Sequence, residues 1–135
     1  MTLDALAHAY LTKAELRLGM TLYAFDHEGW SDVVREAQEL VELCLKGMLR
    51  QIGVDPPRVH DVGPALLANQ AKLPDSIDLA ALARASRELR KDRELSFYGS
   101  EDLIPTEAYD RANAEEAIGY ARLALEAARL VITGS

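Results

Sequence analysis

The stretch SDVVREAQELVELCLKGMLRQIG, residues 31–53, decides the fold class of this chain. Its apolar residues recur every three or four positions, which is the spacing of one face of an α-helix. Ser31 is the predicted N-cap, and Gly53 is the predicted residue that ends the helix. The apolar stripe is wide and consists of Val34, Ala37, Leu40, Val41, Cys44, Leu45, Met48, Leu49 and Ile52.

Helical spacing also occurs on both sides of this stretch. It predicts a first helix over about residues 2–26, a short helix over 64–70 that begins at Pro64, and a fourth helix over 78–97. Pro74-Asp75-Ser76 is typical of a turn followed by a helix cap.

A last helix is expected to end near residue 132, and Thr106 and Asn113 are both candidates for its N-cap. Nothing in the sequence alternates as a strand does, and no segment is repeated. We therefore expect a single domain over residues 1–135 with an all-α fold, an up-and-down antiparallel helical bundle of four long helices plus one short helix.

Composition limits the function. The net charge of −7 argues against a general nucleic-acid binder, which would carry a basic face, although it leaves room for a local basic pocket. No apolar run approaches the roughly 18 residues that a membrane helix needs, so no membrane association is expected. Cys44 is the only cysteine and falls at a core position, which excludes an internal disulfide and fits a cytoplasmic protein.

One residue of the fourth predicted helix breaks its apolar pattern. Counting about 100° per residue, Arg93 lies on the same side as Leu82, Leu89 and Phe97. A guanidinium among apolar side chains needs partners for its donors. Arg93 either reaches the helix end or a core carboxylate such as Glu42, or it belongs to an anion pocket or a subunit interface.

The remaining candidate residues have ordinary structural explanations beside functional ones. His60 is a possible base, but Asp61 next to it is equally suited to cap the short helix. Glu42 and Lys46 form an i,i+4 pair, which is most often a solvated bridge and would otherwise face a cleft. The basic cluster Arg84, Arg87, Arg90 and Lys91 is either an outer face or a track for phosphates. The histidines have no metal-ligand spacing and no glycine-rich phosphate loop occurs, so no metal or cofactor is expected.

Four stretches in order resemble the HEPN superfamily of small helical bundles (higher eukaryotes and prokaryotes nucleotide-binding). The second helix of that family is similar to AQELVELCLKGMLRQIGV (37–54), with its Glu-x-x-x-Lys pair at Glu42 and Lys46. VHDVGPALL (59–67) is similar to the entry into the family's short helix. LRKDRELSFYG (89–99) is similar to its arginine helix, and AYDRANAEEAIGYARLAL (108–125) is similar to the start of its last helix.

The resemblance implies a function and a site. Members often act as ribonucleases with the signature Arg-x4-6-His at a dimer interface, and many are toxin-like partners of a minimal nucleotidyltransferase. Arg93 matches the arginine, but Tyr98 stands where the histidine is expected. Tyrosine, with a reference pKa of about 10, is a poor base near neutral pH. The resemblance thus implies a homodimer that binds a nucleotide or RNA through Arg93, Lys46, His60 and Arg90, with ribonuclease activity weak or lost.

Two alternatives remain open at this point. One is an active metal-independent ribonuclease that uses Arg93 with Tyr98 or His60 as the base. The other is a purely structural dimerisation bundle. The position of Arg93 on the apolar side favours a binding function over the structural one, and Tyr98 disfavours catalysis.

Overall fold

The computed structural model describes residues 3–91 and 109–134, and within them every regular element is a helix. The predicted all-α fold of long helices plus one short helix is confirmed. The elements are α1 (Leu3–Asp26), α2 (Trp30–Gln51), α3 (Gly63–Ala68), a 3₁₀ turn (Gln70–Lys72), α4 (Leu79–Lys91) and α7 (Arg111–Thr133).

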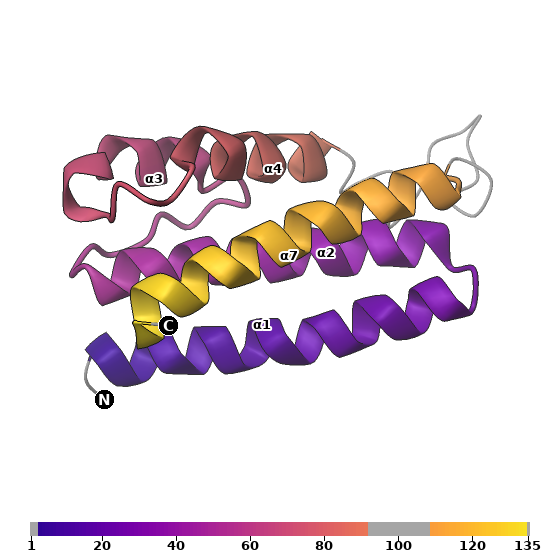
Figure 1. Ribbon diagram of the computed structural model, residues 1–135, viewed down its shortest axis with the longest axis horizontal. Coiled ribbons are helices and arrows are strands. Elements are labelled where there is room, and N and C mark those ends of the chain that lie inside the picture. Colours follow the sequence, from indigo (N-terminus) through magenta and orange to yellow (C-terminus); the bar gives the residue numbers. More distant parts are fainter. Residues whose placement is uncertain (1–2, 92–108, 135) are drawn as a thin grey trace.

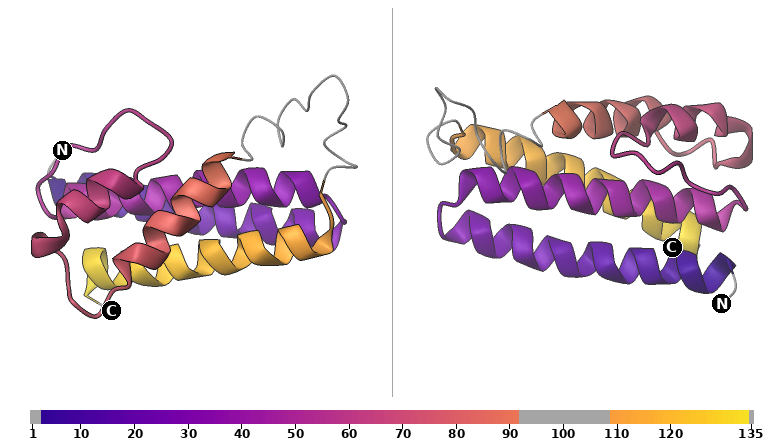
Figure 2. Two further views of the ribbon diagram at one scale, coloured as in Figure 1. Left: turned by 90° about the horizontal axis from the view of Figure 1, so that it is seen from above. Right: turned by 180° about the vertical axis from the view of Figure 1, so that it is seen from behind.

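The long helices run up and down, with α2 and α7 between α1 on one side and α3 and α4 on the other (Figure 1). The helices α1, α2 and α7 pack against one another. The helices α3 and α4 lie on the side of α2 and α7 that faces away from α1, as the further views in Figure 2 also show. The face of α1 and the face of α3 and α4 are therefore opposite surfaces of the bundle.

Small residues allow the helices to approach closely where they meet. The side of α7 that faces the core is mostly alanine, and a Cβ added at Gly47 of α2 would come within 3.1 Å of Tyr10 and Ile132. A Cβ at Gly63 would come within 3.0 Å of the Ala83 backbone, so α3 begins directly against α4. This close contact between α3 and α4 fixes the position of the loop just before α3, and that loop carries His60.

Two predicted helix caps are wrong at the start of α2 and α4. Ser31 is buried inside α2, which begins at Trp30 because Trp30 packs edge-on against Phe25 across a tight turn. At α4 the cap lies beyond the predicted Pro74-Asp75-Ser76 segment, because the Asp78 carboxylate accepts a hydrogen bond from the Ala81 N–H at 3.0 Å.

Neither of the predicted candidates, Thr106 and Asn113, is the N-cap of α7. Asp110 and Asn113 exchange hydrogen bonds of 2.9 Å between side chain and backbone, so Asp110 is the N-cap and Asn113 is the third residue of the helix. Thr106, Arg93 and Tyr98 lie outside the described residues, as does the predicted part of the fourth helix beyond Lys91. Among the helices of residues 3–91 and 109–134, none is long and apolar enough to cross a membrane.

Candidate functional site

The loop that precedes α3 and the last described turn of α4 enclose a depression of about 520 Å³. Its lining is Arg58, Val59, His60, Asp61 and Arg90. The loop supplies four of these residues, and Pro56-Pro57 at its centre restricts its backbone just before Arg58. Two guanidiniums and one imidazole thus line a single surface, although they come from separate parts of the chain.

His60 is held by a carboxylate that is distant in the sequence. Its Nδ1 lies 2.8 Å from Glu42 Oε1 on α2, and Lys46 Nζ donates to Glu42 Oε2 at 2.9 Å. Gln38 also donates to Oε1 at 3.0 Å. The Glu42 side chain is only 14% exposed, so this pair is not a solvated bridge on an outer face. The structure places Glu42 and Lys46 beside the loop that carries His60.

The protonation state of Glu42 follows from this environment. Burial alone would raise the pKa of Glu42, but the hydrogen bonds from Lys46, His60 and Gln38 outweigh it and hold the pKa below its ordinary value. The carboxylate is therefore ionised near neutral pH and only accepts hydrogen bonds. Because Nδ1 of His60 faces that carboxylate, Nδ1 carries the proton, and Nε2 is the nitrogen that accepts a proton.

A second set of hydrogen bonds fastens the loop to α4. Asp61 Oδ1 accepts from Ser86 Oγ at 2.8 Å and from the Gly63 N–H at 3.2 Å, and the Val62 N–H donates to Ser86 Oγ at 3.2 Å. Ser86 is buried, which explains a polar residue within the apolar stripe of α4. The N-cap of α3 is Val62, so Asp61 is not the helix cap that one of the two sequence interpretations expected. Asp61 precedes the cap and holds the loop beside the depression through these hydrogen bonds.

The depression is basic in a protein that is acidic overall. Within residues 3–91 and 109–134, neither Arg58 nor Arg90 pairs with a carboxylate, whereas Lys91 is paired with Glu88. Arg84 and Arg87 are exposed on α4 but do not line the depression. The predicted basic cluster therefore divides, and only Arg90 belongs to this site.

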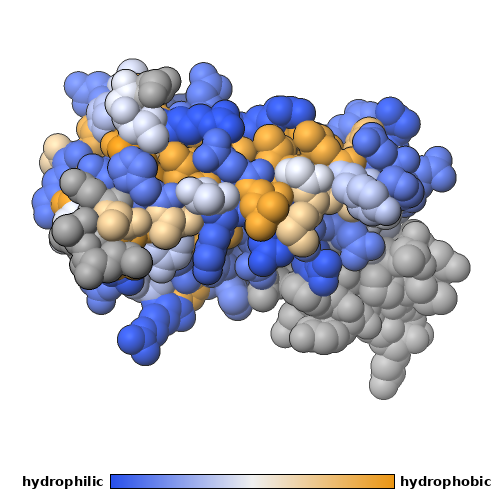
Figure 3. Space-filling view, turned by 90° about the horizontal axis from the view of Figure 1, so that it is seen from below, coloured by the Kyte–Doolittle hydropathy of each residue, from blue (hydrophilic) through white to orange (hydrophobic). Residues whose placement is uncertain are grey.

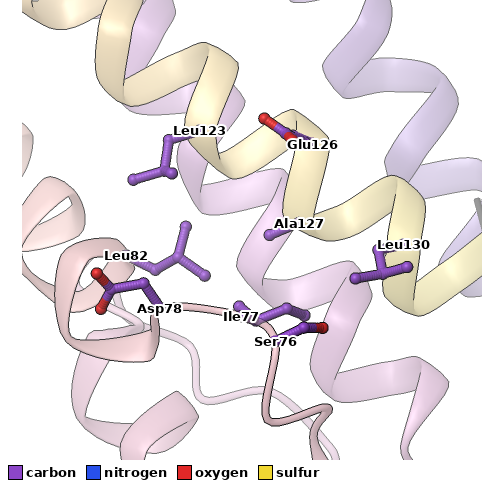
Figure 4. Close-up of a pocket in the computed structure, with 8 residues that line it drawn as sticks. All are labelled: Ser76, Ile77, Asp78, Leu82, Leu123, Glu126, Ala127 and Leu130. Carbon is purple, nitrogen blue, oxygen red and sulfur yellow. The ribbon is translucent and has the colours of Figure 1, made fainter.

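A different hollow, of about 310 Å³, lies between the start of α4 and α7 (Figure 4). Its walls are mainly apolar, with Ile77, Leu82, Leu123 and Leu130 as the largest side chains. The charged residues in its lining, Asp78 and Glu126, are both acidic. Because this hollow has no cation in its lining, it does not suit a phosphate.

Sequence reasoning located this site in part. The structure brings together His60 and Arg90, and it links Lys46 to His60 through Glu42. Arg58 and Ser86 were missed as members of the site. Arg58 had a signal, since it follows a Pro-Pro pair and precedes His60 by two positions, but Ser86 had none beyond being polar on an apolar stripe. In the part of the chain that the structure describes, no three His, Cys, Asp or Glu side chains are grouped as metal ligands.

Comparison with known proteins places the fold. A model of the HEPN domain family matches residues 7–131. The crystal structure of TT1696 from Thermus thermophilus superposes with a TM-score of 0.76 and 25% identity, covering 91% of this chain and 95% of that one. The crystal structure of ST0689, an archaeal HEPN homologue, superposes with a TM-score of 0.71 and 22% identity, covering 93% of this chain and 97% of that one. No curated protein matches the chain.

Proposed function

Because this chain belongs to the HEPN domain family, we propose that it is a nucleotide- or RNA-binding module that holds phosphate groups in the depression beside His60. The observation that carries this proposal is the convergence of Arg58 and Arg90 on one surface without a carboxylate partner among the described residues. A guanidinium matches two phosphate oxygens with two parallel N–H donors, and it stays charged at every physiological pH.

The residues behind the depression have a positioning role in this proposal. Glu42 accepts hydrogen bonds from both His60 and Lys46, so the imidazole is fixed in place and the Lys46 charge is balanced within the protein. Lys46 therefore acts through Glu42, and the residues that touch a phosphate are Arg58, His60 and Arg90. Arg93 joins them on its resemblance to the arginine of the family's signature.

We propose that ribonuclease activity is weak or lost. The family's signature pairs an arginine with a histidine, and here Tyr98 stands at the histidine position after Arg93. Phosphate binding needs charge and planar donors only, whereas cleavage needs a group that exchanges a proton near neutral pH. The substitution therefore affects catalysis more than binding.

One observation favours an active ribonuclease as the second candidate. His60 Nδ1 lies 2.8 Å from an ionised carboxylate, which is how an imidazole base is oriented in many acid–base sites. In that case His60 takes the place of the histidine that the signature lacks. Degradation of RNA without metal by the wild-type protein, abolished in His60→Gln, would favour this candidate.

The assembly that the resemblance implies is part of the proposal. The module acts in the cytoplasm as a homodimer, toxin-like, with a minimal nucleotidyltransferase as its partner. The buried free thiol of Cys44 supports the cytoplasmic location. Co-purification of the untagged chain with a nucleotidyltransferase encoded beside it tests this partner.

Binding to a fluorescently labelled single-stranded RNA tests the site itself. We expect Arg90→Ala and Arg58→Ala each to weaken binding by about tenfold, because a charge-assisted hydrogen bond is worth about 1.5 kcal/mol or more. Arg87→Ala is the matched control, since Arg87 is exposed on the same helix but does not line the depression. Equal losses in all three variants would mean that the positive charge of the wider surface, and not the depression, attracts RNA.

A further inference from the structure

The outer face of α1 exposes large apolar side chains. Leu16 and Tyr23 are both 67% exposed, and Met20 is also exposed. Figure 3 shows apolar residues along the underside of the molecule, the side on which α1 lies. Single exposed apolar residues are normal on a protein surface, but a line of them along one helix marks a contact surface.

The line follows the whole length of the helix. Counting about 100° per residue, the positions within 60° of Leu16 carry one charged residue, Lys13, at the margin. The positions nearest the centre of this surface, which we call the α1 stripe, are Ala5, Ala9, Thr12, Leu16, Met20, Tyr23 and His27.

The side of α1 that faces the bundle is apolar as well. Ala7, Leu11 and Ala14 are buried against α2 and α7. A helix that is apolar on one side only is fully accommodated in a monomer, whereas a helix that is apolar on two opposite sides is expected to be covered on both. The α1 stripe is thus the side of α1 that the monomer leaves uncovered.

The two halves of the stripe differ in size. The N-terminal half has small side chains, Ala5, Ala9 and Thr12, and the C-terminal half has large ones. Tyr23 and His27 stack with their ring centroids 4.1 Å apart, so this half ends in a flat aromatic surface. Beside it, Leu16, Met20, Tyr23 and the start of α2 border a groove of about 640 Å³.

We propose that the α1 stripe binds the α1 stripe of a second copy of this chain, with the two helices antiparallel and the two-fold axis at Leu16. In that arrangement position i lies opposite position 32 − i of the partner. The two copies of Leu16 meet at the axis. On either side of it large residues face small ones, as Met20 faces Thr12 and Tyr23 faces Ala9, and His27 faces Ala5 in the same way. The slender N-terminal half of one helix fits the groove beside the large half of the other.

The charges beside the stripe favour this occupant over nucleic acid. Arg17 is paired with Glu36 at 3.1 Å and Glu15 with Arg129 at 3.1 Å, so these two charged residues beside the stripe are neutralised within each monomer. A phosphate backbone requires cations, and the stripe has Lys13 alone. The self-complementary pattern of large and small side chains is what an isologous contact between identical chains needs.

This inference goes beyond the proposed function, because the depression is lined by the loop before α3 and by α4 and contains no residue of α1. Figure 1 shows α1 on the side of the bundle away from α3 and α4. Pairing through α1 leaves both depressions on the outer surfaces of the dimer.

Sedimentation velocity of Leu16→Glu tests the proposal. We expect this variant to halve the particle mass relative to wild type, because it places two carboxylates on the two-fold axis. Leu67→Glu is the control, since Leu67 is an exposed leucine on α3. An unchanged mass in Leu16→Glu, or a wild-type protein that sediments at the 14.9 kDa of one chain, would overturn the proposal.

Cysteine cross-linking tests the antiparallel orientation. We expect the Ala9→Cys, Tyr23→Cys double variant to form a disulfide-linked dimer under mild oxidation, whereas neither single variant does. Cys44 does not interfere because it is buried, which raises the pKa of its thiol. A cross-linked dimer of either single variant would show that like positions face each other, which contradicts the antiparallel pairing.

Discussion

The outer face of α1 and the face formed by the α2–α3 loop and α4 belong to the same small bundle, yet they offer different chemistry. The α1 stripe has one cation at its margin, whereas the opposite face presents Arg58, His60 and Arg90 around a depression. The first suits burial against another apolar helix, and the second suits an anion. The comparison teaches that a net charge of −7 describes neither face, so partners must be inferred from each surface separately.

The two faces also differ in how they are supported. The α1 stripe needs only the helix that carries it, whereas the depression depends on hydrogen bonds between three elements. Glu42 on α2 holds His60, and Ser86 on α4 holds Asp61. Mutations behind the depression should therefore affect it, while mutations behind the stripe should affect the bundle as a whole.

The largest expected effect concerns the catalytic capacity of the basic face. We expect Tyr98→His to raise metal-independent RNA cleavage by about 10²–10⁴-fold, since that is the usual contribution of a positioned acid–base group. Cleavage of labelled RNA in the presence of a chelator measures it. Arg93→Ala in the same background should remove the gain. If the wild-type protein already degrades RNA robustly and Tyr98→Phe abolishes this, Tyr98 is itself the base and the expectation is wrong.

A smaller effect is expected in the support of the basic face. Glu42→Gln replaces the carboxylate that accepts hydrogen bonds from Lys46 and His60 by a neutral amide. We expect the free energy of unfolding to fall by about 1–3 kcal/mol. Urea unfolding followed by circular dichroism measures it. Glu116→Gln, at an exposed position of α7, is the control. A loss no greater than in the control would mean that the Glu42 cluster does not stabilise the loop.

The pH dependence of stability gives the smallest effect. The pKa of Glu42 is lowered by folding, so its contribution is present above the unfolded-state value of about 4.5 and is lost as pH falls through the folded-state value. We expect the difference in unfolding free energy between wild type and Glu42→Gln to be constant near neutral pH and to shrink below about pH 4.5. A difference that grows on acidification would contradict the assigned direction of the pKa shift.

The sequence predicted the helices better than the site, for physical reasons. Helical periodicity is a local property, so α2 and its apolar stripe were readable from residues 31–53. The bond between His60 and Glu42 spans 18 positions and that between Asp61 and Ser86 spans 25, so neither follows from spacing along one element. The caps Asp78 and Asp110 were missed because several Asx and Ser or Thr residues near each boundary are equally suitable.

The α1 stripe was equally hidden from the sequence. Its residues fit the same helical spacing as the core residues of α1, and the pattern does not say which side faces the bundle. Which of the two apolar sides of α1 is left uncovered became clear only from the packing of α1 on α2 and α7. The resemblance placed the predicted homodimer at the arginine signature, and nothing in the sequence indicated α1 as a contact surface.

The central claim is that the two faces act separately, the basic one on RNA and the apolar one on a second copy of the chain. It is tested most directly by measuring RNA affinity and particle mass on the same samples of wild type, Arg90→Ala and Leu16→Glu. The account predicts that Arg90→Ala weakens binding about tenfold at unchanged mass, while Leu16→Glu halves the mass at unchanged intrinsic affinity per chain. A Leu16→Glu protein that loses RNA binding, or an Arg90→Ala protein that dissociates, would contradict it.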